Sequence, residues 1–447
     1  MEILIIGGIA AGMSVAAKAS RTNRDAKITV IEKEEYVSFG ACGLPYYIGG
    51  QFDDENEMYA RTPQQMMDSG VNLLLGHVVK SVDFDTKSLS TYDIKKDLTV
   101  EKKYDRLMIA TGASAITPPI PGIDSENVYT ITKPYIVNKL KDNLSTYNDI
   151  VIIGGGFIGV EVAEQLAHLG KTVHVVEALD SIMSGPFDTE FTDKLKFALE
   201  ETKVNVHLGE RAETFNTENG KVVSVTTDKQ TLKADAVIVS VGFRPNTAFV
   251  KDQLDMLPNG AIITDKYGKT SVDDVFAAGD CSTVEHRLAG TKYIPLATYA
   301  NKMGRLIGTN IVSDQKDWLP FIGALGSSSI KVGEYEAAST GLTEKEALSL
   351  GLNIKTTLVH TSNHSNYYTD VAQENIMIKL VFDAETLVLY GAQLFGRNET
   401  VLRATGLTTA IYAGLTTEEI GFIDYAYAPP FASTWEALNV AANTAKR

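Results

Sequence analysis

The two cysteines carry the most specific redox chemistry in this chain of 447 residues. Cys42 lies between Gly40 and Gly43, a composition typical of a tight loop at a ligand rather than of a packed core. A lone thiol cycles by two electrons only as a mixed disulfide with a small thiol or as a sulfenic acid. Both cycles need an accessible thiolate, which the start of a helix would favour by lowering the thiol pKa. We therefore predict that Cys42 is redox-active and that Cys281 is a bystander.

Two glycine-rich loops supply the means to bind nucleotides. Residues 154–159 read GGGFIG, follow the apolar run 150–153 and precede a helical pattern that stops at Gly170. In such a loop the glycines permit a tight turn and a close approach of the backbone to a pyrophosphate, which faces the helix N-terminus. Residues 7–12 read GGIAAG and repeat the arrangement between the apolar run 3–6 and a predicted helix at 10–19, although Ile9 replaces the second glycine. The chain therefore carries two copies of one nucleotide-binding design.

A carboxylate follows each loop at the distance expected of a ribose-binding residue. Glu177 ends a predicted strand at 172–177, 18 residues after Gly159, and Glu32 ends a predicted strand at 27–32, 20 residues after Gly12. A carboxylate there accepts a hydrogen bond from a ribose hydroxyl and repels a 2′-phosphate, which favours NADH over NADPH at the second loop. Two dinucleotide sites suggest FAD and NADH together. The alternative is a duplicated scaffold in which one copy has lost its ligand.

Further along the chain a third signal supports a flavin. Residues 270–280 read TSVDDVFAAGD and end a predicted strand at 275–278 on Asp280, which could accept hydrogen bonds from a ribityl chain. The pattern also predicts a helix at 60–71 and strands at 104–110 and 236–242. Residues 117–122 are rich in proline, which predicts a connection between domains. From about residue 321, strands and helices alternate without a phosphate loop, which indicates a separate domain.

Composition excludes several classes of function. The formal charge is −15, from 41 Lys and Arg against 56 Asp and Glu, and no block of basic residues offers a nucleic-acid surface. With two cysteines no disulfide framework is available, which predicts a reducing compartment. The N-terminus carries Glu2 where a signal peptide needs basic residues, and its apolar run is too short to span a bilayer. We expect a cytoplasmic protein that uses no metal ion.

With these motifs in place, the whole chain resembles the pyridine nucleotide-disulfide oxidoreductases. Residues 38–46, SFGACGLPY, are similar to the single-cysteine branch, which includes coenzyme A disulfide reductases, NADH peroxidases and water-forming NADH oxidases. Members with two cysteines carry the second one five positions on, where this chain has Tyr47. The resemblance implies an α/β fold with two Rossmann-like domains, as in glutathione reductase, and a C-terminal α+β dimerisation domain. We expect an FAD-binding domain at 1–113 and 243–320, an NAD-binding domain at 114–242, and the dimerisation domain at 321–447.

The resemblance also implies roles for individual residues. Tyr368 and Tyr427 match the two tyrosines that reach the active site of the partner subunit, where a phenol could protonate a leaving thiolate. Ser14, Lys18 and Arg21 match positions that bind the coenzyme A nucleotide, and Ser38 and Asn301 match positions nearer the thiol. Lys18 and Arg21 share a helix face because they are three residues apart. The cofactor-binding positions are Gly7, Gly8, Ala10, Ala11, Gly12, Glu32, Lys33, Ser38, Val79, Ala110, Thr111, Gly112, Gly154, Gly156, Phe157, Ile158, Gly159, Glu177, Gly242, Asp280, Ala297 and Phe431.

The sequence is compatible with more than one electron acceptor. Peroxidases and oxidases of this branch typically have a histidine in the first loop, where this chain reads Ile9, Ala10 and Ala11. We therefore expect a homodimer that reduces coenzyme A disulfide, or a related persulfide or polysulfide, through a mixed disulfide on Cys42. The alternative is a water-forming NADH oxidase or peroxidase that uses a Cys42 sulfenic acid. Residues 242–247 and 259–265 resemble the corresponding segments of those oxidases. A third hypothesis is a reductase whose partner is a protein.

Overall fold

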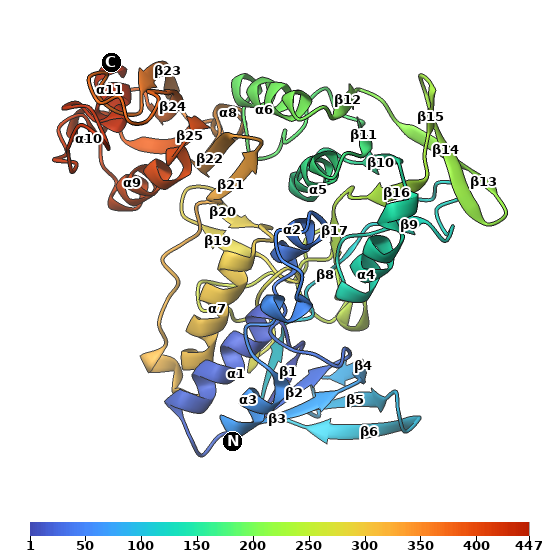
Figure 1. The fold of residues 1–447 in the computed structure, drawn as a ribbon. Helices are drawn as coiled ribbons and strands as arrows, with labels where there is room; N and C mark the ends of the chain where they lie inside the picture. The colour runs from blue at the N-terminus through green and yellow to red at the C-terminus, as the bar shows by residue number, and fades with distance from the viewer. Residues whose placement is uncertain (447) are drawn as a thin grey trace. The chain divides into compact units, whose positions relative to one another are not determined.

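The computed structural model describes residues 1–446 and divides into two compact units. Of the described residues, the first unit contains 1–44, 52–116 and 243–324, and the second contains 45–51, 117–242 and 325–446. Each unit has its own parallel sheet (Figure 1). No helix in the described part of the chain is long and apolar enough to cross a membrane.

The first unit is built on a five-stranded parallel sheet in the order β18-β7-β1-β2-β3. Its strands are β1 (Glu2–Ile6), β2 (Lys27–Glu32), β3 (Val71–Leu75), β7 (Arg106–Ile109) and β18 (Val275–Ala277). Ile3 and Ile5 pack into one apolar cluster, and Leu4 and Ile6 into another. This strand is therefore buried on both faces, which explains the unbroken apolar run in the sequence.

Helices α1 (Ala10–Thr22) and α7 (Ala297–Asn310) lie side by side in this unit (Figure 1). Two glycines of α7 permit the close approach, because a Cβ at Gly304 would lie 2.6 Å from the Ala11 oxygen and one at Gly308 would lie 2.7 Å from the Lys18 Cβ. The remaining elements are α3 (Pro63–Asp68), an antiparallel sheet of β4 (His77–Asp83), β5 (Ser88–Asp93) and β6 (Leu98–Lys103), and the pairs β8 (Ala113–Ala115) with β17 (Phe243–Pro245) and β19 (Val284–His286) with β20 (Gly290–Lys292).

The second unit repeats the parallel design in the order β12-β11-β10-β16-β9. The strands are β9 (Val128–Tyr129), β10 (Asp149–Ile153), β11 (Thr172–Glu177), β12 (Asn205–Leu208) and β16 (Ala236–Val239), and the helices of this segment are α4 (Pro134–Asn143), α5 (Phe157–His168) and α6 (Thr189–Glu201). An antiparallel sheet of β13 (Ala212–Glu218), β14 (Lys221–Thr227) and β15 (Thr231–Lys233) follows β12 in the chain. The short helix α2 (Leu44–Ile48) also belongs to this unit from residue 45 onward.

The C-terminal part of the second unit is an antiparallel sheet in the order β21-β22-β25-β24-β23. Its strands are β21 (Ser328–Val332), β22 (Tyr335–Gly341), β23 (Ile354–Ser362), β24 (Asn375–Asp383) and β25 (Leu389–Arg397), accompanied by α8 (Glu344–Ser349), α9 (Thr400–Ala413), α10 (Thr417–Ile420) and α11 (Ala437–Thr444). The buried ammonium of Lys379 on β24 forms ion pairs with Asp188, Glu190 and Glu344 at 3.2, 2.9 and 2.6 Å. This cluster ties the start of α6 to the C-terminal sheet.

Most elements predicted from the pattern are present, but several differ in extent. The strand predicted at 236–242 ends at Val239, and the helix predicted at 10–19 continues to Thr22. The strands at 27–32 and 172–177 have the predicted bounds. The helix predicted at 60–71 is confined to Pro63–Asp68, because Thr62 and Gln65 form a capping box at its start and Gly70 takes a left-handed φ of +87° after its end. Val71 already belongs to β3. The domain boundaries given above stay predictions.

Candidate active site

The first glycine loop joins β1 to α1 through a backbone that only glycine permits. Gly7 has φ +105°, and a Cβ there would lie 2.1 Å from the Ala110 oxygen. A Cβ at Gly12 would lie 1.9 Å from the Gly7 oxygen. Ile9, at the start of α1, makes no side-chain capping hydrogen bond, so the first N–H groups of this helix are left for an anionic ligand.

The second loop joins β10 to α5 in the same way. Gly154 has φ +106°, and a Cβ there would lie 2.5 Å from the Ser240 oxygen. A Cβ at Gly159 would lie 2.0 Å from the Gly154 oxygen, whereas one at Gly156 would meet no atom within 4 Å. The start of α5 also lacks a side-chain cap. The space beside Gly156 suits a phosphate that approaches the backbone.

Each loop is tied to the carboxylate that the spacing predicts. The Glu32 carboxylate accepts hydrogen bonds from the Gly8 and Glu34 N–H groups at 2.6 and 2.9 Å. The Glu177 carboxylate accepts from the Gly155 and Leu179 N–H groups at 2.7 and 2.8 Å. Each carboxylate is thus oriented by its own loop and strand end. Their assignment to ribose stays a prediction.

The environment of the Asp280 carboxyl group shows that the residues assigned to FAD fit such a ligand. Strand β18 pairs with β7, and Asp280 follows β18 by three residues, next to the segment of Ala110, Thr111 and Gly112 that follows β7. Burial raises the pKa of the Asp280 carboxyl. Within residues 1–446 no side chain or backbone N–H donates to this carboxylate, so it is an acceptor in need of a donor such as a sugar-alcohol hydroxyl.

Cys42 and Cys281 have opposite environments. Cys42 is exposed and lies in a turn of 3₁₀-helix, Ala41–Gly43, which α2 follows directly in the chain. Cys281 is fully buried, and burial raises the pKa of its thiol to about 11. Its Sγ donates to the carbonyl oxygens of Ile109 and Ala278 at 3.5 and 3.4 Å. Only Cys42 is accessible to a substrate.

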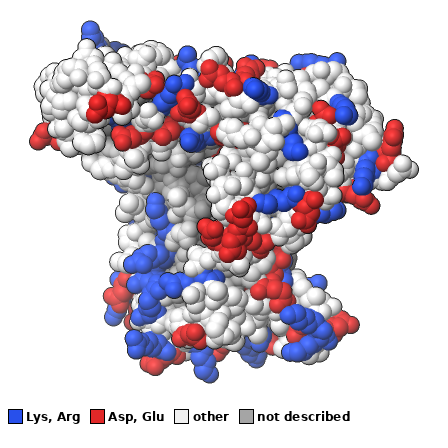
Figure 2. All heavy atoms as spheres, in the orientation of Figure 1, with Lys and Arg blue, Asp and Glu red and all other residues white. Residues whose placement is uncertain are grey.

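The residues assigned to the coenzyme A nucleotide lie together on α1 and α7. The Ser14 hydroxyl donates to the Asn301 side-chain oxygen at 2.9 Å. Lys18 is half-buried and Arg21 exposed on α1. Figure 2 shows basic side chains gathered over this helix pair, which also carries the exposed residues Lys302 and Arg305. This is a local positive surface on an acidic protein.

Three tyrosines of the C-terminal segment, Tyr367, Tyr368 and Tyr427, have different neighbours. The Tyr427 hydroxyl hydrogen-bonds to that of Tyr367 at 2.7 Å, and both side chains are exposed. Tyr368 instead packs edge-on against His364, with ring centroids 5.8 Å apart. Hydrogen bonds with Ser365 and then Tyr427 lower the pKa of Tyr367, while the bond with Tyr367 raises that of Tyr427. The roles expected for Tyr368 and Tyr427 stay predictions, and Tyr367 was not among the predicted site residues.

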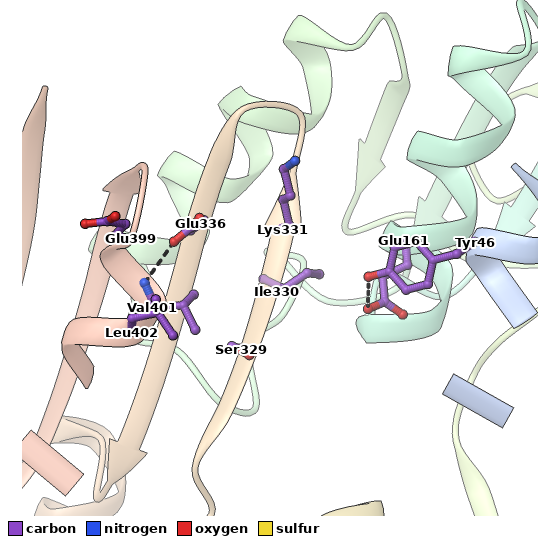
Figure 3. A pocket seen from close by; sticks show the side chains of 9 residues that line it. All are labelled: Tyr46, Glu161, Ser329, Ile330, Lys331, Glu336, Glu399, Val401 and Leu402. Atoms are coloured by element: carbon purple, nitrogen blue, oxygen red, sulfur yellow. Dashed lines mark hydrogen bonds between the residues drawn. The ribbon is translucent and has the colours of Figure 1, made fainter. Parts of the chain in front are cut away.

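A feature that the sequence did not reveal is a cavity of about 390 Å³ in the second unit (Figure 3). It is lined by Tyr46, Glu161, Ser329, Ile330, Lys331, Glu336, Glu399, Val401 and Leu402. The Tyr46 hydroxyl donates to Glu161 at 3.3 Å, and burial raises the pKa of Glu161 to about 7. Glu161 follows Gly159 by two residues in α5. A carboxyl that titrates near neutrality therefore lies in the helix that starts at the second glycine loop.

The other predicted positions occupy the following places. Ala10, Ala11 and Ile158 lie in the first turns of α1 and α5, Phe157 begins α5 and is half-buried, and Ala297 begins α7 and is exposed. Lys33 follows β2 and is exposed, Ser38 takes a left-handed φ of +56°, Val79 lies in β4, Gly242 has φ +110°, and Phe431 is exposed. Among residues 1–446 no group of three or more His, Cys, Asp and Glu residues could hold a metal ion.

Comparison with known proteins gives this arrangement a family. Residues 1–304 match the model of the pyridine nucleotide-disulphide oxidoreductases, and residues 327–438 match the dimerisation domain of the same proteins. The chain is 34% identical over 447 residues to an NADH oxidase of Enterococcus faecalis, covering 100% of this chain and 99% of the relative. It is 35% identical over 452 residues to an NAD(P)H coenzyme A polysulfide/persulfide reductase of Pyrococcus horikoshii, covering 100% and 98%.

Solved structures give the same result. The water-forming NADH oxidase from Lactobacillus brevis, bound to NADH, matches with a TM-score of 0.95 and 31% identity over 99% of this chain and 98% of that one. An NAD-dependent persulfide reductase from A. fulgidus matches with a TM-score of 0.94 and 32% identity over 99% and 83%. The two Rossmann-like sheets and the C-terminal dimerisation domain predicted from sequence are confirmed. The chain therefore belongs to the pyridine nucleotide-disulphide oxidoreductases, a family of FAD-dependent enzymes that use NAD(P)H.

Proposed function

We propose that this protein is a homodimeric NADH-dependent reductase of small disulfides that works through a mixed disulfide on Cys42. Coenzyme A disulfide is the first candidate substrate, and persulfides or polysulfides are the next. The observation that carries the proposal is the contrast between the two cysteines: Cys42 is exposed and Cys281 is fully buried. An electron pair that leaves through a thiol therefore leaves through one sulfur, which forms a mixed disulfide or a sulfenate.

The two glycine loops divide the cofactors between them. The second loop, with Glu177 at the end of β11, holds NADH, and the side chain of Phe157 gates access to the ring that accepts the hydride. The first loop, with Glu32 and Asp280, holds FAD. When bound, FAD supplies two-electron redox chemistry between the nicotinamide and the Cys42 sulfur.

The thiol chemistry balances in two steps. The Cys42 thiolate attacks one sulfur of the disulfide RSSR, so that a Cys42–S–S–R bond forms and RS⁻ leaves and takes up a proton as RSH. Two electrons from NADH and one further proton then break the mixed disulfide, release the second RSH and restore the thiolate. The net reaction is RSSR + NADH + H⁺ → 2 RSH + NAD⁺. The protons come from the phenols of Tyr368 and Tyr427, which we propose act across the dimer interface.

The positive surface on α1 and α7 accounts for the choice of coenzyme A. Lys18 and Arg21 would bind the phosphates of the nucleotide, with Ser14 on the same helix, and Asn301 and Ser38 would lie nearer the thiol. Arg21 is exposed and Lys18 half-buried. Cations near a helix C-terminus also complement the helix dipole, so this surface supports the proposal less strongly than Cys42 does.

A water-forming NADH oxidase is the second candidate. The relatives from Enterococcus faecalis and Lactobacillus brevis favour it. Against it stands the first loop, where Ile9, Ala10 and Ala11 leave no histidine to assist oxygen or peroxide chemistry. In this second candidate Cys42 cycles through a sulfenic acid.

The test is NADH consumption with coenzyme A disulfide under argon, compared with oxygen as the sole acceptor. We expect rapid, Cys42-dependent turnover with the disulfide and slow turnover with oxygen; Cys42→Ser abolishes the first, and Cys281→Ser serves as the matched control that keeps it. A mass spectrum of the intact, unreduced protein adds a second readout. A coenzyme A adduct on Cys42 supports the reductase, whereas fast turnover in air with only oxygen added to the sulfur establishes the oxidase instead.

A further inference from the structure

Two exposed phenols of the C-terminal segment, Tyr367 and Tyr427, lie on loops that are distant in the sequence but adjacent in the structure. Tyr367 lies between β23 and β24, and Tyr427 lies between α10 and α11, yet their hydroxyl groups are 2.7 Å apart. Loops of this kind fluctuate by more than the tolerance of a hydrogen bond unless other bonds fix them. Other hydrogen bonds between the two loops are therefore needed to keep the Tyr367 and Tyr427 hydroxyl groups close.

Arg403 on α9 bonds to both loops at once. Its Nη2 donates to the Asn363 oxygen at 2.7 Å and to the Phe431 oxygen at 2.8 Å, four residues from Tyr367 and from Tyr427 respectively. Its Nε donates to the Glu436 carboxylate at 2.6 Å. The side chains of Arg403 and Glu436 are only 10% and 11% exposed. A guanidinium suits this task because its donors lie in a fixed plane and cannot be deprotonated.

Two further contacts make the assembly rigid. The Ser365 hydroxyl donates to the Ala432 oxygen at 3.2 Å, which is a second bridge between the loops. The second Glu436 oxygen accepts from the Leu438 N–H at the start of α11. Glu436 thus orients the Arg403 guanidinium, which in turn bonds to both loops.

We propose that Arg403 is a positioning residue that keeps the hydroxyl groups of Tyr367 and Tyr427 within hydrogen-bonding distance, so that the two phenols act as one proton donor. This inference rests on the proposed function and adds Tyr367 to the residues that serve it. When RS⁻ leaves, one phenol gives it a proton, RSH forms, and the resulting phenolate is stabilised by the hydrogen bond from the other phenol until water returns the proton. Contacts with Ser365 first and with Tyr427 second lower the pKa of Tyr367, so the bond between the two phenols is one of two contacts that favour its phenolate.

The test uses the acidity of the leaving thiol. An aliphatic disulfide such as coenzyme A disulfide releases a basic thiolate that needs a proton, whereas an aromatic disulfide such as 5,5′-dithiobis(2-nitrobenzoate) releases a stable thiolate that does not. We expect Arg403→Met to lower kcat for the aliphatic disulfide by about 10- to 100-fold, within the usual range of general acid catalysis. The aromatic disulfide should lose less than about threefold, and Arg403→Lys should recover part of the difference.

Arg106 provides a matched control in the first unit. Its Nη1 donates to the oxygens of Asn310, Ile311 and Ser313, so it also fastens backbone carbonyls with a half-buried guanidinium. Arg106→Met should reduce thermal stability without changing the ratio of aliphatic to aromatic rates. If Arg403→Met slows both disulfides equally, or if Arg106→Met changes the ratio as well, Arg403 has a structural role only and the inference is overturned.

A readout without turnover separates this inference from the proposed function. With 3-fluorotyrosine placed at position 367 in the holoenzyme, ¹⁹F NMR should show a phenol pKa below that of the free amino acid, and Arg403→Met should return it toward the free value. An unchanged titration in the variant refutes the positioning role. If the wild-type enzyme reduces neither disulfide while the fluorine titration responds as expected, the proposed function fails and the positioning of Tyr367 stands.

Discussion

The two glycine loops reach one backbone geometry from different sequences. In both, the first glycine takes a φ near +105° and faces a carbonyl oxygen of the neighbouring strand end, Ala110 in one case and Ser240 in the other. In both, a glutamate at the end of the next strand accepts two backbone hydrogen bonds. The shared constraints are therefore the first and last glycines and the carboxylate. The middle glycine is dispensable to the loop itself.

The loops differ in what they leave open. Gly156 has free space where the first loop has the side chain of Ile9, and Glu32 is 5% exposed whereas Glu177 is half-buried. A closed loop with a buried carboxylate suits a ligand that stays, and an open loop suits a ligand that exchanges with every turnover. This difference agrees with the proposal that the first loop holds FAD and the second loop holds NADH.

The largest effect should come from the first glycine of each loop. Gly7→Ala places a Cβ 2.1 Å from the Ala110 oxygen at a φ that side chains rarely adopt, so we expect purified protein that has lost most of its absorbance at 450 nm. Gly154→Ala should keep the yellow cofactor and lose reduction by NADH. Equal loss of flavin from both variants would contradict the assignment of FAD to the first loop. The measurement is the absorbance of FAD released from each purified protein by heating.

Removing one charge from the second loop should have the next largest effect. Glu177→Gln keeps the size of the side chain but weakens its hydrogen bond from Gly155 and the one proposed to the ribose, and a hydrogen bond to a charged group contributes about 1.5–3 kcal/mol. We expect KM for NADH to rise about 10- to 100-fold, with a smaller change for NADPH. Initial rates with both nucleotides measure this, and an unchanged preference between them would remove Glu177 from the ribose site.

The middle glycine should show a smaller effect that is confined to one loop. A Cβ at Gly156 meets no protein atom, and its φ of −80° is open to alanine, so Gly156→Ala should fold normally and retain FAD. The methyl group would occupy space that we propose the pyrophosphate needs. We expect the binding free energy of NADH to weaken by about 1 kcal/mol, which raises KM for NADH roughly fivefold. Equal KM values for variant and wild type would show that the nucleotide does not approach this backbone.

Sequence was sufficient for the strands and glycine loops that we propose hold the cofactors. An apolar run such as 3–6 has one structural solution when both faces of the strand are buried, and the glycine loop that follows has a backbone that few other residues can adopt. The helix predicted at 60–71 was too long because the capping box at Thr62 and the left-handed Gly70 outweigh helix propensity at its ends. Local signals thus set positions well and ends less well.

Sequence was insufficient where contacts join distant segments. Tyr46 and Glu161 are 115 residues apart, and Arg403 meets loops 40 residues before it and 28 after it. Nothing in the type or spacing of these residues marks them as partners. Tyr367 and Tyr368 follow a turn in which the Tyr368 N–H donates to the Ser365 oxygen, and the two adjacent rings have different neighbours.

The smallest predicted effect concerns the position two residues after the last glycine, which is Ser14 in one loop and Glu161 in the other. Burial raises the pKa of Glu161 from 4.5 to about 7, so the folded protein holds this proton more tightly than the unfolded chain. Stability from the neutral carboxyl is therefore present below pH 4.5 and is lost as the pH rises through about 7. Glu161→Gln, which stays neutral, should raise the melting temperature more at pH 8 than at pH 5.5, by on the order of 2 °C.

Glu399→Gln controls for the loss of a negative charge in the same cavity, since Glu399 is exposed there. Differential scanning calorimetry of the three proteins at both pH values measures the difference. The difference should also extend to turnover, because α5 begins at the second loop: if deprotonation of Glu161 shifts this helix, KM for NADH should change with pH between 6 and 8 in the wild type and not in Glu161→Gln. Parallel melting curves and parallel KM profiles for the two proteins would show that Glu161 remains ionised across this range, and that the two loops differ at this position only in shape.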